Sequence, residues 1–484
     1  MPSRLANSFW PPGFSALLIC GVAFGDGNTR GEATPLEKGA DVPTKSGALT
    51  GVDPHTNTST VFAGVNGNNP QTPVTLRPFH LALPRDHLFS DWFGVRTNVE
   101  ALGVTPTLTF VTDVAGNVTG GKSRGVTHAD NLGLDLLFDL DKLSGLKGGS
   151  FLVSMSQRSG NSLSRERVGN VFTIQQVYGG QTFHLIDLAY QQRLLDDRLE
   201  IRLGRIAAGD DFLVSIYDYL FMQNGFCGNP VGIFFNSPGM TAYPNATWGI
   251  LLKLRPTERT YLMGAIYNGD SSIRGNEHNG VDMSMNGPVF AITEAGYQVN
   301  GLPGDSRWLG NYKAGFWYDD ATFTDLTTVG YTVSPVETKG SWGCYALFDQ
   351  ILIPFGEPTS HRGFGLFGSF IVAPDQSISQ MPYFLTAGMA CRGIFASRPR
   401  DVAGFGVVYG QFSDDLRHAQ EREQQLDPPV GVQDYETVLE WTYRLYFRNG
   451  SVFFQPDIQC VINPGGTGRI ENALVLGCQI GINF

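Results

Sequence analysis

The sequence lacks several features that define large protein classes. Its 484 residues contain no run of about 20 consecutive apolar residues, which excludes a membrane-spanning helix. Basic residues are in deficit, with 34 Lys and Arg against 45 Asp and Glu, so the positive surface that nucleic-acid binding requires is absent. Charged residues make up only 16% of the chain, whereas disordered chains are highly charged. Aromatic residues (12%) and the 60 glycines are abundant instead, and this combination favours an all-β fold.

Cysteine and histidine provide no pattern for a metal site or a catalytic centre. Six cysteines would allow disulfides in an oxidising compartment, but Cys391, Cys460 and Cys478 stand at apolar positions of alternating segments, where free cysteine behaves as a small hydrophobe. No CxxC or Cys/His spacing is present, and the eight histidines occur singly. We therefore expect no metal, no cofactor and no enzymatic activity.

The first 85 residues differ in composition from the rest. Arg4 precedes the apolar run 14–23, and we interpret residues 1–25 as a secretory signal peptide, with a buried strand as the alternative. Residues 26–85 are rich in Gly, Thr, Asn and Pro and have little periodicity, so we interpret them as a flexible extension.

From Asp91 onward the dominant hydrophobic period is two residues. In the final segment, apolar residues from Leu474 to Phe484 alternate with small and polar residues from Ala473 to Asn483. Alternation over a dozen residues predicts a strand, and a small, polar second face suits a wall between lipid and water.

The dipeptide Asn449-Gly450 predicts a two-residue hairpin turn of type I′, because both positions tolerate positive φ. This turn opposes apolar residues on one face and polar residues on the other, which a wrong register would mix. The apolar pairs are Phe447 with Val452, Leu445 with Phe454 and Trp441 with Ile458. The polar pairs are Arg444 with Gln455, Thr442 with Asp457 and Glu440 with Gln459.

Similar alternation predicts sixteen strands. They lie near 99–111, 131–141, 150–158, 184–194, 199–207, 247–255, 260–268, 290–299, 311–319, 341–351, 363–372, 383–393, 403–412, 434–447, 451–462 and 471–484. The connections alternate between short ones (195–198, 256–259, 449–450) and long ones (112–130, 159–183, 208–246, 269–289, 320–340, 413–433). Residues 86–484 therefore fit a 16-stranded antiparallel transmembrane β-barrel with short periplasmic turns and long external loops. A soluble β-sandwich also alternates, but its apolar faces point inward.

Several segments resemble the carbohydrate-selective porin (OprB) family, from about Asp91 to the C-terminus. They are LFSDWFGVR (88–96), RLGR (202–205), YPNATWG (243–249), YKAGFWY (312–318) and QPDIQCVINP (455–464). The terminal Phe484 is similar to the signal by which outer-membrane barrels engage the barrel-assembly machinery. The resemblance implies passive diffusion of small sugars through an outer-membrane pore narrowed by inward-folded loops, in contact with outer-membrane lipid. It leaves a homotrimer open.

The segment GNVTGGKS (116–123) matches the P-loop expression G-x-x-x-x-G-K-S. A P-loop holds phosphate at the N-terminus of a helix. The residues after Ser123 have no helical pattern and run into an alternating strand, so we interpret the segment as a glycine-rich loop.

Polar side chains on the predicted inner face are candidates for sugar contact, because sugar hydroxyls need fixed hydrogen-bond donors and acceptors. The lumen-face candidates are Glu200, Arg202, Lys253, Glu440, Arg444, Gln455, Asp457 and Gln459. A structural role, in which Arg444 and Asp457 neutralise each other, is the alternative for that pair.

The longest predicted loop, 208–246, is rich in acidic and aromatic residues, and we expect it to fold into the lumen as a constriction. Its candidate residues are Asp210, Asp211, Tyr217 and Asp218. An ordinary external loop is the alternative. Two other functions stay open: an outer-membrane barrel hydrolase and a secreted all-β carbohydrate-binding protein.

Overall fold

The structure is a computed structural model that describes residues 87–484 except 180, 227–228, 271–280, 282, 300–308, 332–333, 357–361, 427 and 429. The expected signal peptide (1–25) and extension (26–85) lie outside the described residues.

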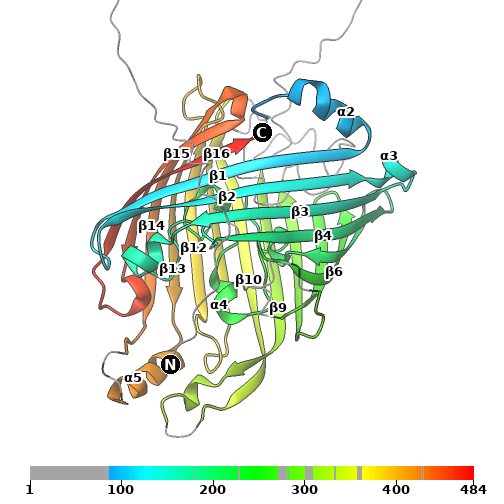
Figure 1. Ribbon diagram of the computed structural model, residues 1–484. Helices are drawn as coiled ribbons and strands as arrows, with labels where there is room; N and C mark the ends of the chain where they lie inside the picture. The colour runs from blue at the N-terminus through cyan, green and yellow to red at the C-terminus, as the bar shows by residue number, and fades with distance from the viewer. Residues whose placement is uncertain are drawn as a thin grey trace, which may run out of the picture. The chain divides into compact units, whose positions relative to one another are not determined.

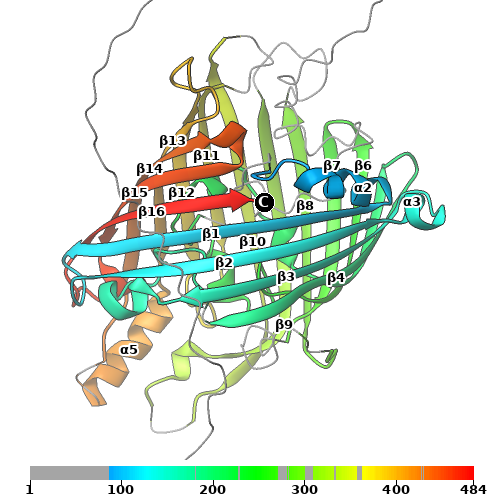
Figure 2. The same cartoon turned by 45° about the horizontal axis from the view of Figure 1, so that its top comes forward.

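In this part of the chain, sixteen antiparallel strands close into a barrel in which each strand pairs with its sequence neighbours and β1 pairs with β16 (Figures 1 and 2). The strands are β1 Val104–Thr119, β2 Gly125–Asp139, β3 Gly149–Gly160, β4 Thr182–Leu194, β5 Leu199–Ile206, β6 Thr247–Thr257, β7 Thr260–Asn268, β8 Val289–Val299, β9 Gly310–Thr324, β10 Glu337–Pro354, β11 Gly363–Val372, β12 Tyr383–Arg392, β13 Val402–Gln411, β14 Tyr435–Phe447, β15 Val452–Ile462 and β16 Ala473–Asn483. The predicted fold class is confirmed.

Helices are short and lie in the connections. They are α2 Val95–Ala101, α3 Leu140–Ser144, α4 Gly232–Asn236 and α5 Asp414–Leu426, with the π-helix η3 Ser164–Val168 and the 3-10 segments η2 Trp92–Gly94, η4 Ala208–Asp210, η5 Asp218–Leu220, η7 Leu326–Thr328, η8 Arg448–Gly450 and η9 Pro464–Gly466. Across the described ranges, every helix is too short or too polar to cross a membrane.

The period-two pattern separates the two surfaces of the wall. Apolar side chains face outward, for example Leu476, which is 47% exposed, while Glu440 on the inward face is fully buried. Outward apolar residues are what a lipid-facing wall requires.

The predicted register of the β14–β15 hairpin is confirmed. Trp441 lies opposite Ile458, and Glu440 lies opposite Gln459. Asn449 has a φ of 59°, as a type I′ turn requires.

The predicted long loop 112–130 is wrong. β1 continues to Thr119 and β2 begins at Gly125, so only a short turn joins them. The polar residues that suggested a loop point inward and alternate with apolar residues that point outward. Asp113 and Asn117 are buried, whereas Val114 and Val118 are exposed. The first half of the P-loop-like segment, residues 116–119, therefore belongs to β1, and strand β2 follows the segment instead of a helix.

The N-terminal segment of the described chain meets the C-terminus. The Leu88 N–H donates to the Asn483 carbonyl (2.7 Å), and the rings of Phe89 and Phe484 stack with centroids 5.9 Å apart. The short turn 195–198 lies at this end of the barrel, and α5 lies at the opposite end (Figure 1).

The described residues of two connections, 161–179 and 207–246 without 227–228, fold into the barrel. Their apolar side chains form a core with inward-facing residues of the wall. The Phe172 ring contacts Phe384 of β12 (5.5 Å), and Phe221 contacts Phe367 of β11 (5.5 Å). Part of the barrel interior is therefore packed like the core of a soluble protein.

Candidate channel constriction

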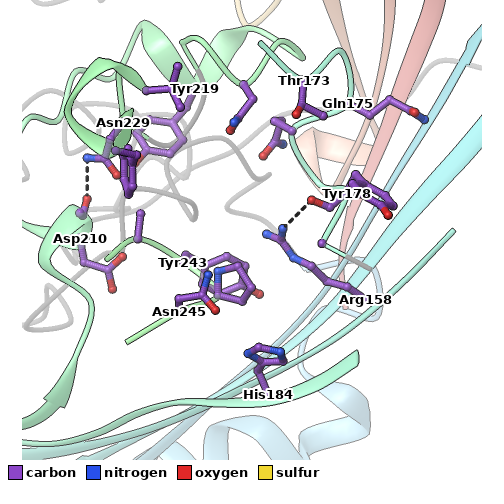
Figure 3. A pocket seen from close by; sticks show the side chains of 18 of the residues that line it. Arg158, Thr173, Gln175, Tyr178, His184, Asp210, Tyr219, Asn229, Tyr243 and Asn245 are labelled. Carbon is purple, nitrogen blue, oxygen red and sulfur yellow. Dashed lines mark hydrogen bonds between the residues drawn. The ribbon is translucent and has the colours of Figure 1, made fainter. Parts of the chain in front are cut away.

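A cavity of about 400 Å³ lies inside the barrel, between the two inward loops and the inner faces of β3 and β4 (Figure 3). Its lining combines two guanidinium groups, a carboxylate, amides and phenol rings. The residues labelled in Figure 3 are Arg158, Thr173, Gln175, Tyr178, His184, Asp210, Tyr219, Asn229, Tyr243 and Asn245. Such a lining offers both donors and acceptors to a polar solute.

Arg158 of β3 is held in one orientation and is only 5% exposed. Its Nε donates to the Asn131 side-chain oxygen (3.1 Å), and its Nη1 donates to the Tyr178 carbonyl (3.4 Å). The guanidinium carbon lies 5.3 Å from the centre of the Tyr243 ring, a cation–π distance. These contacts fix a positive charge at the cavity wall before any solute arrives.

Two tyrosines provide aromatic faces at the cavity. The Tyr243 hydroxyl is bonded to the Asn131 amide (3.1 Å), which orients its ring. Tyr178 accepts a hydrogen bond from Arg165, whose guanidinium lies 5.6 Å from the Tyr178 ring centre. Oriented rings with polar ends can pack against an apolar sugar face while the wall binds its hydroxyls.

Of the four candidate constriction residues, Asp210 alone lines this cavity. Asp211 is bound by the Arg202 guanidinium at 2.7 Å. Tyr217 stacks on Phe367 of β11, with centroids 5.8 Å apart.

Asp218, the fourth candidate, is only 2% exposed. Burial raises the pKa of this carboxyl well above its usual range; nearby Asp349 adds to the rise, and Lys313 opposes it. The predicted loop thus lies in the lumen, but most of its candidate residues point into packed surroundings.

The candidates on β5 and β6 form a charged group beside the start of the long loop. Arg202 binds Glu200 (3.0 Å) as well as Asp211, and the Lys253 ammonium lies 4.7 Å from the Tyr261 ring centre. The structure brings these residues together on the inner face, outside the cavity lining.

The five candidates on β14 and β15 face inward but are covered by the inward loops. Glu440 accepts the N–H groups of Met222 (2.6 Å) and Gln223 (3.2 Å). Arg444 donates to the Tyr219 carbonyl (2.9 Å), and Gln455 donates to the Leu220 carbonyl (2.6 Å).

The remaining two candidates lie beside them. Gln459 donates to the Ile174 carbonyl (3.2 Å) and to Asp457 (2.9 Å). Arg444 donates to the side-chain oxygen of Gln455, and its neutralisation by Asp457 stays a prediction. None of these five side chains belongs to the described cavity lining.

Sequence reasoning missed Arg158, His184, Tyr178 and Tyr243. A signal for Arg158 was present, because Ser154, Ser156 and Arg158 alternate along β3 as buried polar residues. Tyr243 and Asn245 belong to the YPNATWG segment, which suggested a family but no role for its residues.

Comparison with known proteins agrees with this architecture. A model of the family described as "Carbohydrate-selective porin, OprB family" matches residues 123–484. Porin B of Pseudomonas aeruginosa is 28% identical over 422 residues, covering 81% of this chain and 90% of that protein. The putative porin QuiX of Acinetobacter baylyi is 26% identical over 431 residues, covering 83% and 93%.

Among solved structures, the high-pH structure of Pseudomonas putida OprB matches with a TM-score of 0.76 and 26% identity, covering 83% of this chain and 99% of that chain. None of these matches supports the hydrolase or the secreted binding protein. Because the family model covers well over half of the sequence and the fold agrees, this chain belongs to the carbohydrate-selective porin (OprB) family and is an outer-membrane channel protein.

Proposed function

We propose that this porin passes small sugars passively and that the sugar moves along the wall formed by β3 and β4. The observation that carries the proposal is the lining of the cavity, where Arg158 and Asp210 supply opposite charges. A sugar hydroxyl can donate to the carboxylate and accept from the guanidinium, and hydrogen bonds to charged groups are the stronger ones.

The loop that forms the other side of the cavity supports the same path. In segment 219–223, the side chain of Tyr219 lines the cavity while its carbonyl accepts from Arg444 of the wall. One surface of this segment is thus available to solute, and the other is bonded to β14. Polar residues of β14 and β15 then position the loop rather than bind sugar.

The proposal includes partners and processing. Outward apolar residues contact outer-membrane lipid, Phe484 serves as the signal for the barrel-assembly machinery, and residues 1–25 direct export before the extension 26–85. A homotrimer is compatible with this scheme.

Conductance in a planar lipid bilayer tests the proposed path. Stable channels whose current falls saturably as glucose is added are expected. Asp210→Asn should raise the half-saturating glucose concentration about tenfold, as loss of a charged hydrogen-bond partner worth about 1.5–3 kcal/mol implies.

Glu337→Gln is the matched control, since Glu337 is exposed at the start of β10 and lies outside the cavity lining. Channels that ignore glucose would contradict the sugar function. Equal half-saturation in wild type and Asp210→Asn would contradict the path.

A further inference from the structure

Four cationic side chains cluster at the end of the barrel that carries the long loops. Lys122 and Arg124 lie on the turn between β1 and β2, and Arg165 and Arg167 lie on η3. The two segments are joined, because the backbone N–H groups of Lys122 (2.8 Å) and Ser123 (2.9 Å) both donate to the Arg167 carbonyl. We call Lys122, Arg124, Arg165 and Arg167 the basic rim.

The charges of the basic rim are not neutralised locally. Within the described ranges no ion pair joins any of the four to a carboxylate, whereas Lys339 and Arg417 pair with Asp320 and Asp414. The Lys122 ammonium donates a hydrogen bond to the Arg165 carbonyl (3.4 Å), and the Arg167 guanidinium donates one to the Ser123 hydroxyl (3.3 Å).

Two carboxylates, Glu166 and Glu471, belong to the same or adjoining segments, which leaves cations in excess. This excess stands out in a chain whose net charge is −11.

The positive charge continues into the channel. Arg165 of the basic rim also lines the cavity, and Arg158 lies farther inside on the same lining. Asp210 is the one carboxylate among the described lining residues. Cations therefore run from the external surface to the cavity, and a single acidic group opposes them there.

We propose that the substrates this pore prefers are anionic sugars, carbohydrates that carry a carboxylate or phosphate group, and that the basic rim draws them to the cavity. This inference rests on the proposed sugar function. A cleft lined by one sign of charge concentrates oppositely charged solutes at its mouth. Guanidinium groups match carboxylate and phosphate oxygens in geometry as well as charge.

Block by glucuronate and by glucose, added on the side of the long loops, provides the test. Bilayers of phosphatidylcholine alone are used, so that no anionic lipid competes. At about 0.1 M KCl glucuronate should block at a several-fold lower concentration than glucose. At about 1 M KCl the difference should shrink, because the screening length falls from about 10 Å to about 3 Å.

The double variant Lys122→Gln/Arg124→Gln removes two rim charges outside the cavity lining. The matched control is Lys339→Gln/Arg417→Gln, which removes one Lys and one Arg elsewhere on the exposed surface. At about 0.1 M KCl the rim variant should raise the half-saturating glucuronate concentration about 1.7-fold, as two charges acting through water over about 10 Å at a screening length of about 10 Å imply. Its glucose block should equal that of wild type and of the control.

The outcomes separate the two claims. If glucose and glucuronate both fail to block, the proposed function falls. If glucose blocks, but glucuronate blocks at no lower concentration and the rim variant leaves the half-saturating glucuronate concentration unchanged, only the anionic preference is wrong.

A second experiment adds phosphatidylglycerol to the bilayer. If the rim variant alters channel insertion there while glucuronate block stays unchanged, the rim binds lipid headgroups and the inference is overturned.

Discussion

Two parts of the inner barrel wall carry buried polar side chains, but one part anchors a loop and the other lines a cavity. On β14 and β15, Glu440 and Gln455 are bonded to the backbone of the inward loop. On β3 and β4, Arg158 and His184 line a cavity. Alternation along a strand thus shows which side chains point inward. It does not show which of them meet solute.

The difference follows from what a chain segment needs when it is buried. Backbone N–H and C=O groups inside the barrel require hydrogen-bond partners, and polar side chains of β14 and β15 supply them. Room for the loop comes from glycine on β13. A Cβ at Gly406 would lie 2.5 Å from Phe226, and one at Gly404 would lie 2.6 Å from Leu220. The covered wall is therefore built to receive the loop.

The largest effect is expected where the loop is anchored. Glu440→Ala would leave the buried N–H groups of Met222 and Gln223 unpaired, at a cost of about 1–3 kcal/mol for each. The temperature at which the folded band is lost in a heat-modifiability gel should fall. Glu337→Ala, at an exposed position, should leave it unchanged. An unaltered transition in Glu440→Ala would show that the loop does not depend on this carboxylate.

A smaller effect separates the two walls by function. Arg158→Gln should raise the half-saturating glucose concentration about tenfold, because a charged hydrogen-bond donor is lost from the cavity. Arg444→Gln makes the same chemical change on the covered wall, so it should lower the gel-transition temperature and leave glucose block nearly unchanged. The reverse pattern in bilayer recordings would assign the sugar path to β14 and β15.

The smallest effect concerns pH and tests whether the loop is buried. The raised pKa of Asp218 means that the folded state holds this proton more tightly than the unfolded state does. Stability is therefore greatest at low pH and falls as pH rises from about 4 towards the raised pKa, by up to about 1.4 kcal/mol per pH unit.

Asp218→Asn removes this dependence. The gel-transition temperature of the variant, measured relative to that of wild type, should therefore rise as pH increases from about 4 to about 8. Parallel curves for the two proteins would indicate that Asp218 is accessible to water.

The strands, their direction and much of their pairing can be predicted from the order of residues, because alternation and turn chemistry are local properties. The pairing of Glu440 with Gln459 followed from one Asn-Gly turn. The same reasoning failed at 112–119, where an inward polar strand resembles a loop. Which inward residues are covered depends on how the loops fold inside the barrel. Loop 207–246 bonds to residues of β14 and β15 more than 200 positions away, and no local pattern records contacts at that separation.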